Sequence, residues 1–212
     1  MSGKYPAPEL WSDFDGTAVE ILPLFHPRNW IKFPLGMLHG YSDFLRAIQN
    51  SGITIGGIVS KRPSIIRYWP TLFTIKSLKL DTYFRGKQIV LCGTNRGKGR
   101  FIVLRAQERP IAMLEDKPHK LLPPLLLAIE RYTKASLPLK PIIVGVVNHP
   151  RNHEYLTMAL KRIDRPSRRI KAVRGQWQVF VSEYPRPVLT IVLLDPYTSK
   201  SGQHFAGLIK SA

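Results

Sequence analysis

The sequence predicts an α/β fold, a Rossmann-like doubly wound parallel sheet. Short apolar runs alternate with helix-like segments as far as about residue 160, the pattern of strands joined by crossover helices. The 212 residues, 44% of them hydrophobic, suit one domain with a substantial core. The pattern changes after residue 160. We therefore expect a core over residues 1–160 and a basic, β-rich C-terminal extension over residues 161–212.

Five buried strands are expected in the core, and helices connect them. The strands are predicted over residues 8–14, 53–59, 88–92, 111–114 and 141–147. The helices are predicted over residues 41–50, 64–76, 98–107 and 119–134. In the first of these helices, Phe44, Leu45 and Ile48 share one face, and Pro70 should kink or interrupt the second helix.

The C-terminal extension begins with a strongly basic run. Residues 161–174 read KRIDRPSRRIKAVR, and only Asp164 is acidic. Two apolar runs follow, over residues 177–184 and 187–195, and Tyr184 to Pro187 should form the turn between them. This arrangement predicts a β-hairpin instead of a further strand–helix unit.

Charge is the most unusual bulk property. Thirty-two Lys and Arg residues against fourteen Asp and Glu residues leave a formal net charge of +18. Such an excess favours a polyanionic partner, namely a nucleic acid, a ribonucleoprotein or an anionic membrane surface, although a solvated basic surface without a specific partner explains it too. The single cysteine, Cys92, excludes an internal disulfide. With neither an apolar leader nor a spanning stretch visible, we expect a cytoplasmic protein without a membrane partner.

The string Ser12-Asp13-Phe14-Asp15-Gly16-Thr17 carries the clearest chemical signal. It ends the first predicted strand, where ligands gather in sheets of this class. Asp13 is placed to attack a phosphorus atom, and Asp15 to protonate the leaving alkoxide and later accept a proton from water. Gly16 permits a backbone conformation that brings the loop close to a phosphate. A capped turn is the alternative for this pair of aspartates.

This DxDGT string resembles motif I of the haloacid-dehalogenase-like (HAD) superfamily, and three further motifs can be sought in order. Ser60 follows the second strand and is similar to the motif II hydroxyl that binds the phosphoryl group. Lys98 resembles the motif III lysine, with Lys87 and Lys76 as alternatives. Glu115 and Asp116 resemble the acidic motif IV.

The resemblance implies a HAD-like core and a Mg²⁺-dependent phosphatase that forms an aspartyl-phosphate intermediate. Asp13, Asp15, Ser60 and Lys98 would be catalytic. Asp13, Asp15 and Asp116 would hold Mg²⁺, while Glu115 is either the direct ligand or acts through water. A hard cation and a lysine would relieve the repulsion between an attacking carboxylate and a phosphate.

The spacing of the motifs leaves no room for a folded cap domain, so a capless, open site is expected. Residues 18–40 would form a flap, in which Phe25, Trp30 and Phe33 pack on the core or contact substrate. Together with the charge, this suggests a phosphorylated substrate that is a nucleic acid or nucleotide. Residues that would bind its backbone are Arg62, Arg67, Arg165, Arg168, Arg169 and Arg174. One alternative is a non-enzymatic, basic nucleic-acid-binding or ribonucleoprotein-binding module on the same fold. Another is a phosphatase of small metabolites that is merely basic.

Overall fold

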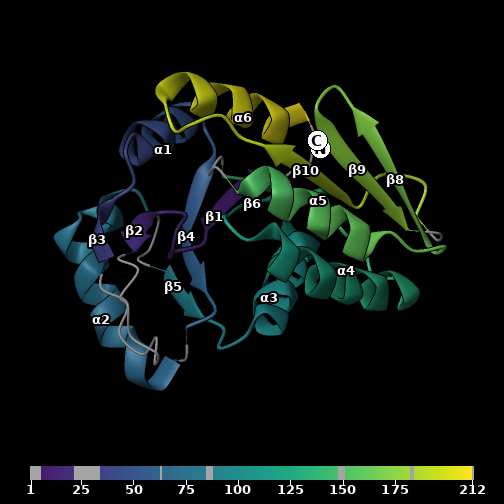
Figure 1. The fold of residues 1–212 in the computed structure, drawn as a ribbon, viewed down its shortest axis with the longest axis horizontal. Helices are drawn as coiled ribbons and strands as arrows, with labels where there is room; N and C mark the ends of the chain where they lie inside the picture. Colours follow the sequence, from purple (N-terminus) through teal and green to yellow (C-terminus); the bar gives the residue numbers. More distant parts are fainter. Residues whose placement is uncertain are drawn as a thin grey trace, which may run out of the picture.

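The computed structural model describes residues 6–21, 34–62, 64–84, 88–147, 151–181 and 184–211. The strands are β1 (Glu9–Ser12), β2 (Val19–Ile21), β3 (Pro34–Met37), β4 (Thr54–Ser60), β5 (Gln88–Leu91), β6 (Ile111–Glu115), β7 (Ile142–Val146), β8 (Arg168–Val173), β9 (Gln176–Val181) and β10 (Leu189–Leu193). The helices are α1 (Tyr41–Asn50), α2 (Ser64–Ser77), α3 (Asn95–Glu108), α4 (Pro118–Lys134), α5 (Asn152–Ile163) and α6 (Ser199–Ser211), with a 3₁₀ turn at Leu80–Thr82 (Figure 1).

One eight-stranded sheet organises the described part of the chain. Its order is β5-β4-β1-β6-β7-β10-β9-β8, and the first six of these strands are parallel. Numbered along the chain, the parallel strands have the order 3-2-1-4-5-6, which is typical of Rossmann-like sheets. The predicted α/β class is therefore confirmed. In such sheets ligands bind where the strand order reverses, which here is between β1 and β6.

The central strand β1 contributes side chains to two separate hydrophobic layers, because successive side chains of a strand point to opposite faces. Leu10 packs in one layer with residues of α1, α2 and α6, whereas Trp11 packs in the other with residues of α3, α4 and α5. Both side chains are completely buried. The sheet is thus covered by helices on both faces, which holds the carboxyl end of β1 rigidly at the edge of the core (Figure 1).

A buried acid at the start of β1 explains why this strand is more polar than its neighbours. The Glu9 carboxylate accepts a hydrogen bond from Trp11 Nε1 at 2.9 Å. Arg105 Nη2 on α3 donates to the same oxygen at 2.9 Å. Burial of a carboxylate is tolerated when it is paired and hydrogen-bonded, as it is here.

The residues after 160 continue the main sheet. β10 pairs in parallel with β7 and antiparallel with β9, and β9 in turn pairs with β8. The sequence pattern predicts β9 and β10 as a hairpin extension and does not predict β8, α5 or α6. The apolar run of β10 is consistent with a strand buried on both faces, but such a run does not encode the direction of pairing. α6 packs against α1, with the rings of Phe44 and Phe205 stacked 6.1 Å apart.

Two local predictions concern Pro70 and the flap over residues 18–40. α2 continues without a break through Pro70. Of the flap expected over residues 18–40, the structure describes an antiparallel pair, β2 with β3. Residues 22–33, and with them Phe25, Trp30 and Phe33, lie outside the described residues. In the part that is described, no helix is long and apolar enough to cross a membrane.

Candidate active site

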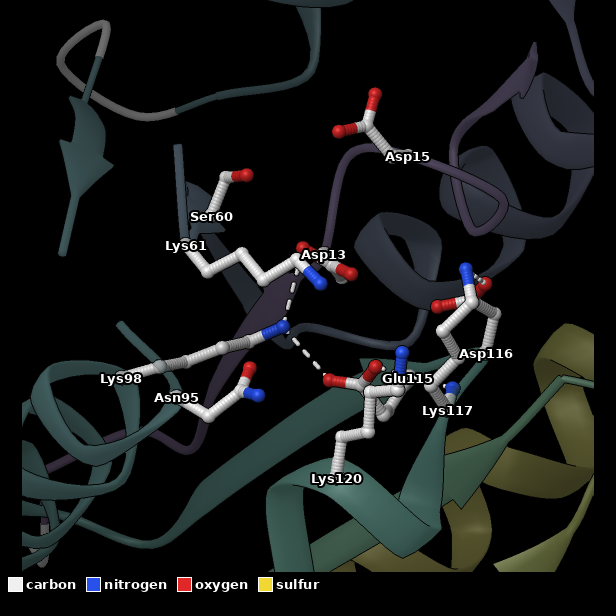
Figure 2. A pocket seen from close by; sticks show the side chains of 10 residues that line it. All are labelled: Asp13, Asp15, Ser60, Lys61, Asn95, Lys98, Glu115, Asp116, Lys117 and Lys120. Carbon is white, nitrogen blue, oxygen red and sulfur yellow. Dashed lines mark hydrogen bonds and ion pairs between the residues drawn. The ribbon is translucent and has the colours of Figure 1, made fainter. Parts of the chain in front are cut away.

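A pocket lies at the carboxyl ends of β1, β4 and β6, beside the first turns of α3 and α4. Figure 2 shows its lining side chains, which come from segments more than a hundred residues apart in the sequence. They are Asp13, Asp15, Ser60, Lys61, Asn95, Lys98, Glu115, Asp116, Lys117 and Lys120. All the residues predicted to be catalytic or to hold the metal are therefore in one place, at the reversal point of the strand order.

Lys98 joins the ends of β1 and β6. Its Nζ lies 3.0 Å from Asp13 Oδ1 and 2.6 Å from Glu115 Oε2. The position of Lys98 follows from the start of α3, where the Thr94 side chain caps the helix by accepting a hydrogen bond from Gly97 N at 3.0 Å. Lys98 is 2% exposed. Its ammonium group is therefore held in a fixed position between the two carboxylates.

The electrostatics of this pair follow from burial. Burial raises the pKa of Asp13 to about 6; Lys98 opposes this rise and Glu115 adds to it. Burial alone would lower the pKa of Lys98, but the carboxylates of Asp13 and Glu115 outweigh it, so this pKa is raised. Lys98 is consequently a permanent cation at neutral pH. Asp13 is ionised at neutral pH, which a nucleophilic carboxylate requires.

The raised pKa of Asp13 predicts a pH dependence of stability. In the unfolded chain this pKa returns towards 3.8, so the folded protein takes up the proton first as the pH falls. The unfolding free energy should rise as the pH falls from about 7 to about 4, by up to about 3 kcal/mol from this group. Denaturant unfolding in EDTA measures the unfolding free energy of the wild type and of the Asp13→Asn variant at each pH. The difference between the two should show this gain. A difference that is constant over this range would contradict the assignment.

Three buried carboxylates form a group with the properties of a cation site. Single oxygens of Asp13, Glu115 and Asp116 lie within 4.8 Å of one another. Asp116 Oδ2 pairs with Lys117 Nζ at 2.6 Å, but its Oδ1 is buried without a hydrogen-bond partner. An unpartnered carboxylate oxygen beside two other acids fits a hard cation such as Mg²⁺, which prefers oxygen ligands. Burial, then Asp13, raises the pKa of Asp116, and a bound cation would relieve both effects.

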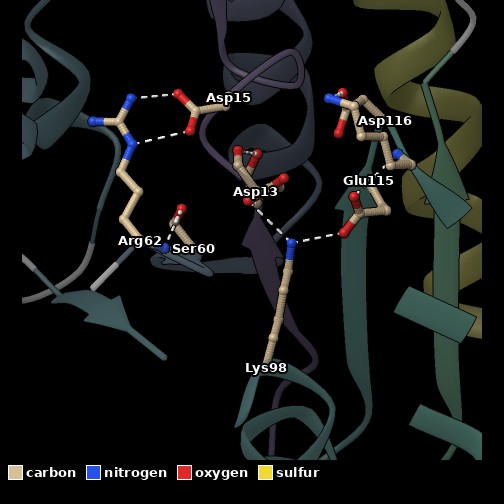
Figure 3. A network of polar contacts seen from close by, with 9 residues as sticks. Asp13, Asp15, Ser60, Arg62, Lys98, Glu115 and Asp116 are labelled. Atoms are coloured by element: carbon tan, nitrogen blue, oxygen red, sulfur yellow. Dashed lines mark hydrogen bonds and ion pairs between the residues drawn. The ribbon is translucent and has the colours of Figure 1, made fainter. Parts of the chain in front are cut away.

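Asp15 lies apart from these three acids. Both of its carboxylate oxygens accept hydrogen bonds from Arg62: Nε donates to Oδ2 at 2.9 Å and Nη2 donates to Oδ1 (Figure 3). Arg62 Nη1 donates to Thr71 Oγ1 at 3.0 Å, and the guanidinium lies 4.8 Å from the centre of the Phe14 ring. Arg62 thus occupies both oxygens of Asp15 in this arrangement. That Asp15 also holds the metal stays a prediction.

Ser60 is the last residue of β4 and is 1% exposed. Its Oγ lies 3.4 Å from the backbone nitrogen of Arg62, and Figure 2 shows the hydroxyl near Asp13. Ser60 and Asp13 are neighbours because β4 and β1 pair in parallel, with Ile58 opposite Ser12. A hydroxyl in this position is able to donate a hydrogen bond to a phosphate oxygen.

Gly16 allows the loop after β1 to pass close to Asp116. It has a φ of +76°, and a Cβ at this position would lie 2.4 Å from Asp116 Oδ2. Gly175 has nearly the same φ, +75°, but a Cβ added there would meet nothing within 4 Å. A side chain at either glycine would strain the backbone, but only one at Gly16 would also clash with Asp116. Comparing substitutions at the two positions therefore distinguishes the two effects.

We expect Gly16→Ala to destabilise the protein by about 2–3 kcal/mol, against about 1 kcal/mol for Gly175→Ala. Only the first substitution adds a conflict with Asp116 to the strain of a positive φ. Thermal and denaturant unfolding of both variants measure the difference. Equal losses would mean that Gly16 makes no close approach to the acids.

Sequence reasoning missed several residues of the pocket. Lys61, Asn95, Lys117 and Lys120 line it, and each lies within a few residues of a predicted site residue. Their nearness in sequence to the predicted site residues could have identified them. The pairing of Arg62 with Asp15 had no such signal, because 47 positions separate the two residues along the chain.

The arginines expected to bind nucleic acid have different environments. Arg62 is buried and its guanidinium contacts the Asp15 carboxylate. Arg168 is also buried, and its Nη2 lies 2.9 Å from Glu130 Oε2. This contact, before any other cause, lowers the pKa of Glu130. Both guanidinium groups are buried against carboxylates, so contact with a backbone phosphate would require each to leave its partner. That these two arginines bind nucleic acid stays a prediction. Arg165, Arg169 and Arg174 are exposed, and the side chain of Arg67 lies outside the described part.

No protein-family model matches the chain, and no curated protein shows significant similarity to it. The resemblance to the HAD-like superfamily stays a prediction from the motifs.

Proposed function

We propose that this chain is a Mg²⁺-dependent phosphohydrolase of the HAD-like type that cleaves phosphate monoesters. The observation that carries the proposal is the contact of one buried lysine with both Asp13 and Glu115, beside the unpartnered oxygen of Asp116. An aspartate that attacks a phosphate needs cations on both sides of it to reduce charge repulsion. Lys98 supplies one of them, and the three carboxylates supply a place for the other.

In the proposed reaction an Asp13 carboxylate oxygen attacks phosphorus, and the bond from phosphorus to the leaving oxygen breaks. Asp15 gives its proton to that oxygen. Asp15 then takes a proton from water, whose oxygen attacks phosphorus, and the bond to Asp13 breaks to release phosphate. Lys98 stays in contact with Asp13, and Ser60 donates to a phosphoryl oxygen. Mg²⁺, held by Asp13, Asp116 and Glu115, would neutralise charge on the phosphate.

The contact between Arg62 and Asp15 adds one requirement to this mechanism. Both Asp15 oxygens accept from the guanidinium, so Asp15 must exchange at least one partner and take up a proton from water before it donates one to the leaving oxygen. Arg62 is a positioning residue for Asp15 in this proposal. Its effect should be largest on substrates whose leaving groups need protonation.

Metal dependence tests the proposal directly. Hydrolysis of mononucleotides, sugar phosphates and phosphorylated oligonucleotides should require Mg²⁺ and stop in EDTA. Asp116→Asn should lower kcat/KM by on the order of 10²-fold or more and raise the Mg²⁺ concentration needed for half-maximal rate. Asp43→Asn, at an exposed acid on α1, is the matched control and should change neither value. Full activity in excess chelator would disprove the metal assignment.

A second candidate function is a basic nucleic-acid-binding or ribonucleoprotein module without catalysis. Exposed arginines at Arg165, Arg169 and Arg174, together with the net charge of +18, favour it. The same observations support a nucleic acid or nucleotide as the phosphorylated substrate of the proposed enzyme. Binding of oligonucleotides with no hydrolysis of any phosphate ester would favour the second candidate.

A further inference from the structure

Two lysines of the pocket, Lys61 and Lys120, lie outside its ion pairs. Each of the four acids already has a cationic partner: the pairs are Asp13–Lys98, Glu115–Lys98, Asp116–Lys117 and Asp15–Arg62. Lys61 and Lys120 line the same pocket, yet neither forms an ion pair with a carboxylate of the described residues. Three cations share these four pairs, so with Lys61 and Lys120 the group has five cations against four acids and one positive charge in excess.

The two lysines reach the pocket from different elements of the fold. Lys61 follows β4 directly, and Lys120 belongs to the first turn of α4. Figure 2 shows their side chains extending towards the acids from these two walls. The pKa of Lys120 is lowered, mainly by burial and then by Lys61 and Lys117, and the carboxylates of Asp116 and Glu115 offset this only in part. These positive charges are therefore close enough to repel one another. A bound anion would relieve this repulsion.

The phosphate attacked by Asp13 does not account for both lysines. Lys98, the hydroxyl of Ser60 and the proposed Mg²⁺ already supply partners for its oxygens. Two further cations at the rim suit an additional anionic group a few ångströms away. Lysine is well suited to such a contact because it acts as a flexible point charge towards phosphate.

We propose that Lys61 and Lys120 form a subsite for a second phosphate on the same substrate. This inference rests on the proposed function, because it takes the first phosphate to bind at Asp13. The substrate class is then a phosphate monoester with a neighbouring phosphate. A nucleoside bisphosphate and a terminally phosphorylated oligonucleotide both have this chemistry.

Equilibrium binding tests the subsite without relying on turnover. In the Asp13→Asn background with Mg²⁺, calorimetry should show adenosine 3′,5′-bisphosphate binding at least about tenfold more tightly than adenosine 5′-monophosphate. Adding Lys61→Gln and Lys120→Gln should reduce this ratio to about one. Adding Lys200→Gln and Lys210→Gln, two exposed lysines of α6 outside the pocket, should preserve it. Thermal unfolding of each variant shows whether it is folded.

The outcomes separate this inference from the proposed function. Equal binding of the two nucleotides, or a ratio that survives loss of both lysines, would overturn the subsite. A ratio that depends on the lysines in a protein whose wild type hydrolyses no phosphate would support the subsite and overturn the phosphatase. A 5′-phosphorylated tetrathymidylate identifies the source of the second phosphate. Tighter binding of this oligonucleotide than of the bisphosphate assigns a phosphodiester, and weaker binding assigns a small bisphosphate.

Discussion

Asp13→Asn should abolish phosphate ester hydrolysis, lowering kcat by on the order of 10⁴-fold or more. The amide cannot attack phosphorus as the carboxylate can, so no covalent intermediate forms. The fold should persist, because Lys98 keeps its 2.6 Å contact with Glu115 and no large buried side chain is lost. Single-turnover assays with a chromogenic phosphate and Mg²⁺ measure the loss.

The matched control for this experiment is Asp15→Asn, which retains a nucleophile. It should lose more activity on alkyl phosphates than on nitrophenyl phosphate, whose leaving group needs no proton. Asp13→Asn should lose activity equally on both substrates. Turnover near the wild-type rate by purified Asp13→Asn protein would refute the assignment of the nucleophile.

Arg62→Met should destabilise the protein by about 3–5 kcal/mol. The substitution leaves the Asp15 carboxylate, in a residue that is 8% exposed, without its guanidinium partner. It also removes a hydrogen bond to Thr71 and the contact with the Phe14 ring. Urea unfolding of the wild type and the variant measures the difference in unfolding free energy.

A double variant separates the ion pair from packing. Arg62→Met combined with Asp15→Asn should recover part of the loss, because no buried charge is then left unpaired. Arg62→Lys should be intermediate, since an ammonium group cannot make both contacts of the guanidinium fork. A loss below about 1 kcal/mol in Arg62→Met would mean that water or another cation replaces the arginine.

The convergence of the motif residues was predictable from the sequence, since the carboxyl ends of parallel strands meet at one edge. Asp13, Ser60 and Glu115 each end or follow an apolar run, and this pattern alone places them together. Lys98 follows from the start of a helix near the same edge. The burial of Lys98 between Asp13 and Glu115 could not be predicted, because the sequence pattern does not give distances between separate segments.

The remaining features depend on three-dimensional packing that pattern reasoning does not reach. Arg62 reads as a surface cation beside Lys61, yet it is buried because Asp15 and Thr71 satisfy its nitrogens. Arg168 reads as part of a solvated basic run, yet it is buried in contact with Glu130 on α4. The parallel pairing of β10 with β7 was not predicted for a different reason, namely that the apolar run of a strand does not say which strand becomes its neighbour.

The position of β8 gives the basic run a consequence for solubility. Among the described residues β8 is the last strand in the sheet order, and none of them pairs with its outer side, so that side could pair with another molecule. Arg169 and Lys171 on this edge strand are exposed to solvent, and Arg174 follows in the turn. Two such edges brought together would place like charges side by side, which opposes the growth of intermolecular β-sheet. Neutralising this edge should therefore promote aggregation even in a protein that keeps its stability and its pocket intact.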